Sequence, residues 1–178
     1  MFIMEQKCSQ DRVFSVFVDE PLKIHYIKEI AKKISLAPTS VKNHLKNLEN
    51  QELIQKKKGE RFVGFIANRD NKNFLFYKKI ANIIKIKESG LLDFLIDSLY
   101  PQAIILYGSY LKGEDIESSD VDVMIITDNK KQIDIKRFEK ILKRNIHLIM
   151  EKNLKKLHEG VKTEVTNGFV LYGRLKNE

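Results

Sequence analysis

The residues from Ile104 to Ile126 constrain the fold of this chain most strongly. They read IILYGSYLKGEDIESSDVDVMII, with an apolar run at each end and a polar segment between them. Apolar runs of about four to eight residues, rich in β-branched side chains and bounded by turn-forming residues, are typical of buried strands. We therefore expect two buried strands, one ending at Tyr107 and the other starting near Val121, joined by a polar connection.

Two carboxylates open the second run. Side chains alternate across a strand, so Asp120 and Asp122 are expected to point to the same face. Two neighbouring carboxylates on a rigid strand repel each other, and a bound divalent cation relieves that repulsion. Mg²⁺ is commonly held by one or two carboxylates together with substrate phosphates. The pair therefore predicts a magnesium site.

The residues after the first run suit a phosphate group. Gly108 lets the backbone approach a ligand closely, and Ser109 adds a hydroxyl. If residues 109–113 begin a short helix, the free N–H groups of its first turn face a phosphate. Together with the metal carboxylates, these residues would hold a nucleoside triphosphate and its metal.

The order Gly108-Ser109, ten further residues, then Asp120-Val121-Asp122 resembles the signature of the polymerase-beta-like nucleotidyltransferases. It is most similar to their minimal branch, which includes the antitoxin halves of some toxin–antitoxin pairs. Gly113, Ser119 and the terminal NGFVLYG also match that branch.

The resemblance implies that the chain transfers a nucleotidyl group, above all adenylyl from ATP, to a hydroxyl. Asp120 and Asp122 would be catalytic and hold Mg²⁺. Nucleotide-binding residues would be Gly108, Ser109 and Ser119.

The strand expected over residues 145–150 departs from this family. Active members usually carry a third carboxylate there, and this segment has none. His147 has the position expected of the missing acid and is the third catalytic candidate, with Glu151, one residue past the strand, as a weaker substitute. A neutral imidazole can accept a proton or bind a metal, but it adds no negative charge. The alternative is that His147 is a polar residue with no catalytic task.

The first part of the chain predicts three helices and a hairpin. Apolar residues at helical spacing indicate helices over residues 11–19, 27–34 and 38–50, and Pro38 suits the first turn of the third. Residues 53–56 and 61–66 read as two strands that turn at residues 58–60.

This arrangement resembles a winged helix-turn-helix. That family would place residues 38–50 in a major groove of double-stranded DNA and residues 56–61 against the flanking backbone. The predicted DNA contacts are Thr39, Ser40, Lys42, Asn43, Lys46, Lys57 and Lys58. The alternative is a winged helix used only for protein contacts or dimerisation.

The whole chain is therefore expected to be α+β, with a winged helix-turn-helix over residues 1–70 and a small mixed α/β nucleotidyltransferase-like domain over residues 71–178. Residues 71–100 would form connecting helices, the first carrying Phe76, Ile80, Ile83 and Ile84. That helix could pair subunits into a homodimer or pack against its own domain. Further elements are expected as a helix over 131–144, a strand over 145–150, a helix over 154–166 and a strand over 168–173.

Composition narrows the classes of partner. The 178 residues carry a formal net charge of +8, which favours polyanionic partners. An apolar content of 43% indicates a folded chain. No segment approaches a transmembrane span or a signal peptide, so we expect no membrane contact. The single Cys8 rules out an internal disulfide and fits a cytoplasmic location.

The predicted function is a DNA-binding nucleotidyltransferase whose acceptor hydroxyl belongs to a partner protein, such as a toxin tyrosine. A rival is a transcriptional regulator whose degenerate transferase domain senses a nucleotide or a partner. A third candidate, a transferase acting on small molecules such as antibiotics, predicts an acceptor cleft with its own acidic residues, which the sequence does not reveal.

Overall fold

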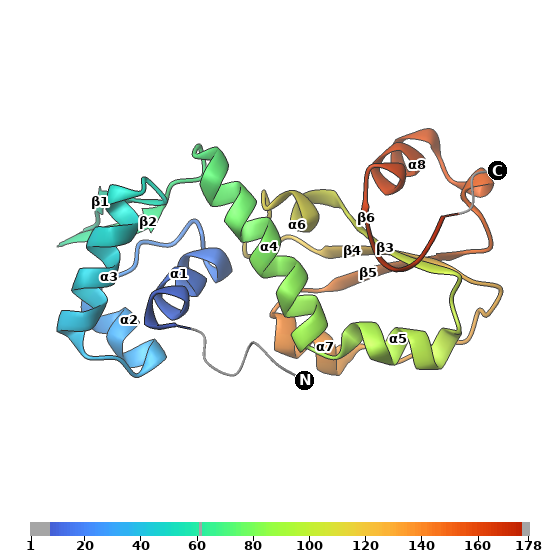
Figure 1. The fold of residues 1–178 in the computed structure, drawn as a ribbon, viewed down its shortest axis with the longest axis horizontal. Coiled ribbons are helices and arrows are strands. Elements are labelled where there is room, and N and C mark those ends of the chain that lie inside the picture. The colour runs from blue at the N-terminus through green and yellow to red at the C-terminus, as the bar shows by residue number, and fades with distance from the viewer. Residues whose placement is uncertain (1–7, 61, 176–178) are drawn as a thin grey trace. The chain divides into compact units, whose positions relative to one another are not determined.

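A computed structural model describes residues 8–60 and 62–175 (Figure 1). The chain divides into two compact units, Met1–Lys78 and Lys79–Glu178. The division falls inside the helix α4 (Lys72–Glu88), whereas the sequence placed the domain boundary at the polar residues just before this helix.

The first unit consists of three helices followed by a two-stranded antiparallel hairpin. A shared core of apolar side chains, among them Val13, Phe17, Ile30, Val41 and Leu45, holds the helices together. This order of elements confirms the sequence prediction, although both strands start one or two residues later than expected and residue 61 lies outside the described residues. The elements are α1 (Ser9–Asp19), α2 (Ile27–Ile34), α3 (Pro38–Asn50), β1 (Ile54–Lys58) and β2 (Val63–Ala67).

The turn between α2 and α3 depends on Ser35. This residue adopts a left-handed backbone conformation with φ 51°, a position that glycine usually occupies. Its N–H donates to the carbonyl of Ala31, and so does the N–H of Leu36 at 3.0 Å. The helix therefore ends without glycine, and Pro38 starts the next helix at its first turn.

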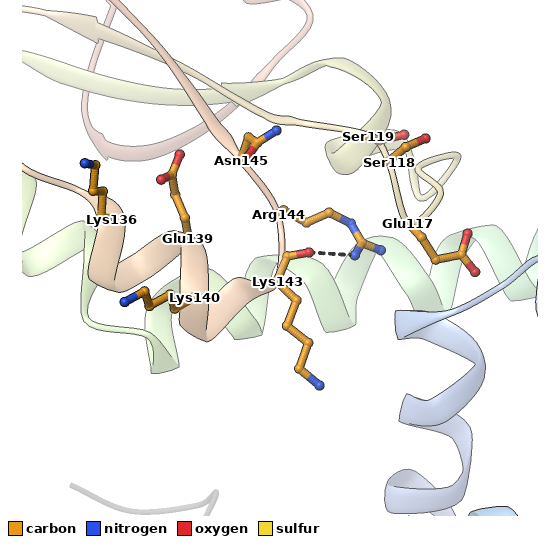
Figure 2. Close-up of a pocket in the computed structure, with 9 residues that line it drawn as sticks. All are labelled: Glu117, Ser118, Ser119, Lys136, Glu139, Lys140, Lys143, Arg144 and Asn145. Atoms are coloured by element: carbon orange, nitrogen blue, oxygen red, sulfur yellow. Dashed lines mark hydrogen bonds between the residues drawn. The ribbon is translucent and has the colours of Figure 1, made fainter.

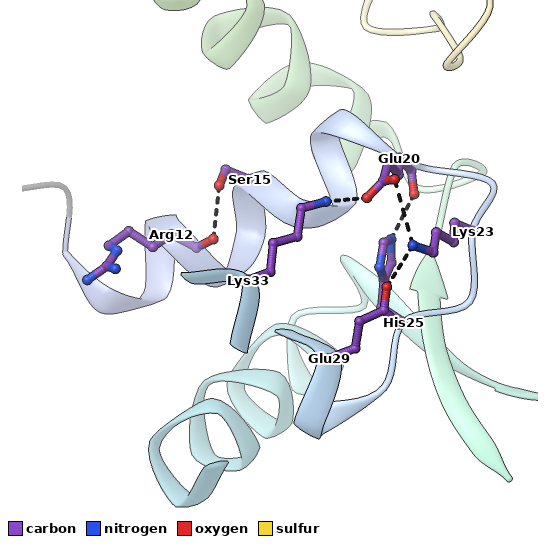
Figure 3. Close-up of polar contacts among 7 residues, drawn as sticks. All are labelled: Arg12, Ser15, Glu20, Lys23, His25, Glu29 and Lys33. Atoms are coloured by element: carbon purple, nitrogen blue, oxygen red, sulfur yellow. Dashed lines mark hydrogen bonds and ion pairs between the residues drawn. The ribbon is translucent and has the colours of Figure 1, made fainter. Parts of the chain in front are cut away.

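His25 is fully buried in the first unit and joins the hairpin to the helices. Its backbone exchanges hydrogen bonds with Phe65, and its Nε2 lies 3.0 Å from the carbonyl oxygen of Glu20. Its ring packs edge-on against Phe17, with 5.1 Å between centroids. Figure 3 shows the surrounding ion pairs, of Lys33 with Glu20 and of Lys23 with Glu29.

The second unit is built on a four-stranded mixed sheet with the order β5-β4-β3-β6. β4 runs antiparallel to β3 and parallel to β5, and β6 pairs with the other edge of β3. Ile104, Leu106 and Val123 face a core shared with α5 and α7, while Ile105 and Met124 face α8 (Figure 1). The elements are α5 (Leu91–Leu99), β3 (Ala103–Tyr107), α6 (Gly108–Lys112), β4 (Val121–Ile126), α7 (Lys136–Leu142), β5 (Ile146–Glu151), the 3₁₀ turn η1 (Leu154–Lys156), α8 (Glu159–Thr166) and β6 (Phe169–Gly173).

Two predicted helices were too long. α7 covers only Lys136–Leu142 of the expected residues 131–144, because side chains of the preceding loop bind backbone N–H groups. Asn129 Oδ1 accepts from the N–H of Lys131 at 3.0 Å, and Asp134 Oδ1 accepts from that of Lys136 at 3.0 Å. The last predicted helix is likewise broken into η1 and α8 by extended backbone at Leu157 and His158.

The longest helix in the described part of the chain is α4. It is the first of the helices expected over residues 71–100, but two of the apolar residues that suggested it, Phe76 and Ile80, are exposed. The buried positions are instead Phe74 and Lys78 in the first unit, and Asn82 and Ile86 in the second. Across the described residues, no helix is long and apolar enough to cross a membrane.

A buried polar network fixes the loop between α6 and β4. Asn82 Nδ2 lies 2.8 Å both from the carbonyl oxygen of Tyr110 and from Asp115 Oδ1. Arg144 Nη2 lies 3.6 Å from Asp115 Oδ2, and the two side chains are only 7% and 1% exposed. Because a buried carboxylate is costly without partners, these contacts hold the loop in one conformation.

We predict that lowering the pH below neutrality destabilises the first unit through His25. Burial lowers the pKa of His25 from its usual 6.5, and its buried Nδ1 has no hydrogen-bond partner among the described residues. Below pH 6.5 the unfolded chain therefore takes up a proton that the folded chain resists. The free energy of unfolding then decreases as the pH is lowered, by up to about 1.4 kcal/mol per pH unit. Thermal melts between pH 7.5 and 5.0 would measure this loss.

His25→Gln removes the titrating group, so it should flatten this part of the pH profile, whereas the control His158→Gln should keep it. Lysine partners lower the pKa values of Glu20 and Glu29 below 4.5, so their stabilising contribution is lost only at more acid pH. A His25→Gln profile as steep as that of the wild type between pH 6.5 and 5.0 would refute the prediction.

We predict that Asn82→Leu destabilises the second unit by about 1–3 kcal/mol, because it leaves the Asp115 carboxylate with one hydrogen bond fewer in the interior. Urea denaturation followed by circular dichroism would measure the change. The exposed substitution Asn167→Leu, at the residue that follows α8, is the control and should cost under about 0.5 kcal/mol. Equal stability of Asn82→Leu and wild type would show that the network does not support the loop.

Candidate functional site

Gly108 stands where β3 passes into α6, and no other residue fits there. Its φ is +74°, and a Cβ at this position would lie 2.4 Å from Asp122 Oδ2. The short helix expected at residues 109–113 is present as α6, which ends at Gly113 with φ 75°. The backbone of Gly108 is therefore packed directly against one of the two predicted metal carboxylates.

Asp122 lies between residues of the two neighbouring strands. Its register partners are Tyr107 on β3 and His147 on β5. His147 Nδ1 lies 3.2 Å from Asp122 Oδ1, and the imidazole is 57% exposed. The pKa of the Tyr107 phenol is raised, first by burial and then by the charge of Asp122. His147 thus lies beside the carboxylate, as its position in the sequence predicted, while its catalytic role stays a prediction.

Asp120 lies just before β4 and is held by a residue that the sequence analysis did not single out. Asn145 Nδ2 donates to Asp120 Oδ1 at 3.2 Å. Between the two acids, Val121 points into the core with no exposed surface. Alternation then places Asp120 and Asp122 on the opposite side of the strand. The clue to Asn145 was its spacing, since it precedes His147 by two residues as Asp120 precedes Asp122.

The two predicted nucleotide-binding serines differ in their contacts. Ser119 closes the loop before Asp120, because its Oγ accepts from the N–H of Ile116 at 3.0 Å and its own N–H donates to the carbonyl of Ile116. Ser109 is half-buried, and its carbonyl accepts from Gly113 and, at 3.0 Å, from Glu114. The hydroxyl of Ser119 thus has a structural task in the loop.

Glu151 does not stand in for the missing carboxylate. It belongs to β5, where we had expected it one residue past the strand, and it pairs with Ile126 at the far end of β4. His147 pairs with Asp122 near the start of β4, so four residues of strand, about 13 Å, separate Glu151 from the site.

The donors present fit a hard cation. Asp120 and Asp122 provide carboxylate oxygens on one face, which are the ligands that Mg²⁺ prefers. In the described ranges, no group of three His, Cys, Asp or Glu side chains is placed to hold a metal ion. Two carboxylates alone would therefore leave positions for phosphate oxygens and water.

A cavity of about 480 Å³ opens in the second unit (Figure 2). It lies between the end of α7 and the loop that leads into β4, and Asn145 connects it to Asp120. The cavity is lined by Glu117, Ser118, Ser119, Lys136, Glu139, Lys140, Lys143, Arg144 and Asn145.

The predicted DNA-contacting residues lie on the surface of the first unit. α3 buries Val41, Leu45 and Leu48 on one side. Its other side carries exposed or half-exposed polar residues, and β1 carries two exposed lysines; they are Thr39, Ser40, Lys42, Asn43, Lys46, Lys57 and Lys58. The neighbouring Lys56 pairs with Glu49 at 2.9 Å.

Comparison with known families supports a minimal nucleotidyltransferase in the second unit. Residues 88–172, from the end of α4 to β6, match the family model described as a nucleotidyltransferase domain. The matched segment contains the Gly108-Ser109 turn, both acids and His147. Comparisons with curated proteins and with solved structures gave no match. Nucleotidyl transfer, which in this family generally uses a nucleoside triphosphate and a divalent metal, is therefore the chemistry that the match supports for residues 88–172.

Proposed function

We propose that the second unit transfers an adenylyl group from Mg²⁺-bound ATP to an acceptor hydroxyl. One observation carries this proposal: the Gly108 backbone lies against the Asp122 carboxylate, inside the segment that matches nucleotidyltransferases. This packing brings the proposed phosphate-binding turn and the proposed metal carboxylates together at adjacent ends of β3 and β4.

Neighbouring strands carry the residues for different tasks of the proposed site. Gly108 and Ser109 at the end of β3 would bind the β- and γ-phosphates, and Asp120 and Asp122 on β4 would hold the metal. The metal, when bound, offsets negative charge at the α-phosphate during in-line displacement. The protein's own residues position the nucleotide so that its α-phosphate faces the β5 side of the site.

His147 is placed to take the proton of the acceptor hydroxyl. If Nδ1–H donates to Asp122, Nε2 is the ring nitrogen left to accept this proton. A general base of this kind contributes about a hundred- to ten-thousand-fold to rate. Replacing a carboxylate by an imidazole also lowers the negative charge near the metal, which favours slow turnover.

We predict that Asp120→Asn with Asp122→Asn abolishes the gain in ATP affinity that Mg²⁺ confers, because it removes the charge that the cation offsets. Calorimetric titration of ATP with and without Mg²⁺ would measure this gain. The matched control is Asp128→Asn, which removes an exposed carboxylate at the far end of β4. Equal Mg²⁺-dependent affinity in the wild type and the double variant would exclude this metal site.

Transfer itself is followed with α-labelled ATP, and His147 decides the outcome. His147→Asp should raise transfer because it adds a third negative charge beside Asp122, whereas His147→Ala should abolish it if Nε2 is the base. Binding of Mg-ATP without transfer in both the wild type and His147→Asp would instead favour the rival, a regulator that senses nucleotide.

We also propose that the first unit is a winged helix-turn-helix that binds double-stranded DNA. Three helices followed by a hairpin, with exposed short polar and lysine side chains on α3, support it. α3 would enter the major groove while Lys57 and Lys58 contact the phosphate backbone. A transferase that also binds DNA could regulate its own gene.

We predict that Lys42→Glu with Lys46→Glu weakens binding to DNA from upstream of the gene, and that binding falls steeply with salt, because each neutralised phosphate releases counterions. Lys42 and Lys46 are also expected to neutralise phosphates at the edge of the groove, so their loss should reduce the salt slope by about two. The control is Lys130→Glu with Lys131→Glu, an identical charge change on an exposed loop of the second unit. Fluorescence anisotropy that shows salt-independent binding, or equal loss in the control, would refute this interface.

A further inference from the structure

The cavity in the second unit is cationic. Lys136, Lys140 and Lys143 reach it from α7 and from the residue that caps α7. Among the residues that the structure describes, none of these three ammonium groups has an ion-pair partner. The lining also contains two acids, Glu117 and Glu139. Glu139 Oε1 accepts a hydrogen bond from the N–H of Ile146 at 3.0 Å.

Arg144 adds a fixed positive charge to the cavity. Its side chain is 7% exposed, lies 3.6 Å from Asp115, and donates from Nη1 to the carbonyl of Lys143 at 2.9 Å (Figure 2). Because the guanidinium is held in place, the protein bears the cost of ordering it before any ligand arrives. Lys143 lies in the left-handed region with φ 54°, which turns the chain sharply between α7 and β5.

The cavity also lies on a defined side of the site. Gly108 and Ser109 follow β3, on one side of β4, whereas the cavity lies towards β5, on the other side. Asn145 belongs to its lining and donates to Asp120 at 3.2 Å. A ligand whose phosphate is held there would have to extend past Asn145 to bring its hydroxyl to Asp120 and Asp122, and it would be apart from the turn proposed for the β- and γ-phosphates.

We propose that this cavity binds the acceptor, and that the acceptor is a small molecule with both a free hydroxyl and a phosphate ester. This rests on the proposed transfer. A cavity of about 480 Å³ has the size of small-molecule sites. Lysine and arginine are the side chains that recognise phosphate. The same charges disfavour cationic acceptors. A cleft for a cation would need more acidic than basic residues, whereas basic residues outnumber acidic ones in this lining.

The reaction balances without a further reactant. The acceptor oxygen forms a bond to the α-phosphorus of ATP, and the bond from that phosphorus to the bridging oxygen of pyrophosphate breaks. The hydroxyl proton goes to Nε2 of His147, and pyrophosphate is the leaving group. The products are the adenylylated phosphate ester and pyrophosphate.

The lysines have a competing structural explanation, since cations near a helix C-terminus stabilise the helix. The two explanations predict different results. If the lysines only stabilise the helix, replacing them should lower the melting temperature without changing the affinity for phosphate. If they bind the ligand, replacing them should change this affinity while the fold persists. Neutral Lys140→Gln with Lys143→Gln, tested beside Lys140→Glu with Lys143→Glu, separates them because glutamine also supports a helix.

The experiment uses the full chain and three acceptors that share the 2,3-diol of a ribose: ribose 5-phosphate, ribose, and a short RNA with a free 3′ end. Binding of ribose 5-phosphate is followed by calorimetry without nucleotide, and adenylyl transfer by label from ATP. Both double substitutions of Lys140 and Lys143 should weaken ribose 5-phosphate binding by about tenfold or more. The control Lys156→Glu, beyond the other end of β5, should leave it unchanged. Mg-ATP affinity should stay constant in all variants.

The outcomes separate this inference from the proposed transfer. Equal phosphate affinity in pocket and control variants, or preferred labelling of ribose or of the RNA end, overturns the acceptor assignment even if transfer is present. Lysine-dependent binding of ribose 5-phosphate with no labelling upholds the pocket as a phosphate-ester site and counts against transfer.

Discussion

The contact between the Gly108 backbone and the Asp122 carboxylate is the constraint on which the site depends. Only a residue without a side chain permits it, because a Cβ would lie 2.4 Å from Asp122 Oδ2. The contact brings the end of β3 to the start of β4, and the parallel pairing of β4 with β5 places His147 at 3.2 Å on the other side. Three adjacent strands thus present, along one edge, the turn proposed to bind phosphate, the carboxylate pair and the proposed proton acceptor.

The buried network at Asp115 gives this edge its rigidity and links it to the cavity. Asn82 and Arg144 approach Asp115 from α4 and from the end of α7, so the loop that carries Ser119 and Asp120 is fixed from two directions. Arg144 also lines the cavity. The same residue therefore contributes to the folded loop and to the charge that the proposed acceptor would meet.

Local patterns in the sequence predicted most of the fold. β-branched runs indicated β3 and β4, and the spacing of Gly108 and Asp122 indicated that they lie together, while their task stays a proposal. The start of α7 was not predictable from periodicity, because Asp134 captures the N–H that a longer helix would use. Asn145 and the Asp115 network join residues 25 to 33 positions apart, and only the folded sheet brings them together. The cavity, likewise, is made by α7 and a distant loop.

The most direct test of the account is a crystal structure of the full chain with Mn²⁺ and a non-hydrolysable ATP analogue, using the anomalous signal of manganese to locate the ion. The account predicts a manganese peak bound by Asp120 and Asp122, with the β- and γ-phosphates at Gly108 and Ser109 and the α-phosphate facing His147. Nucleotide bound elsewhere, or a manganese ion that contacts neither carboxylate, would contradict it.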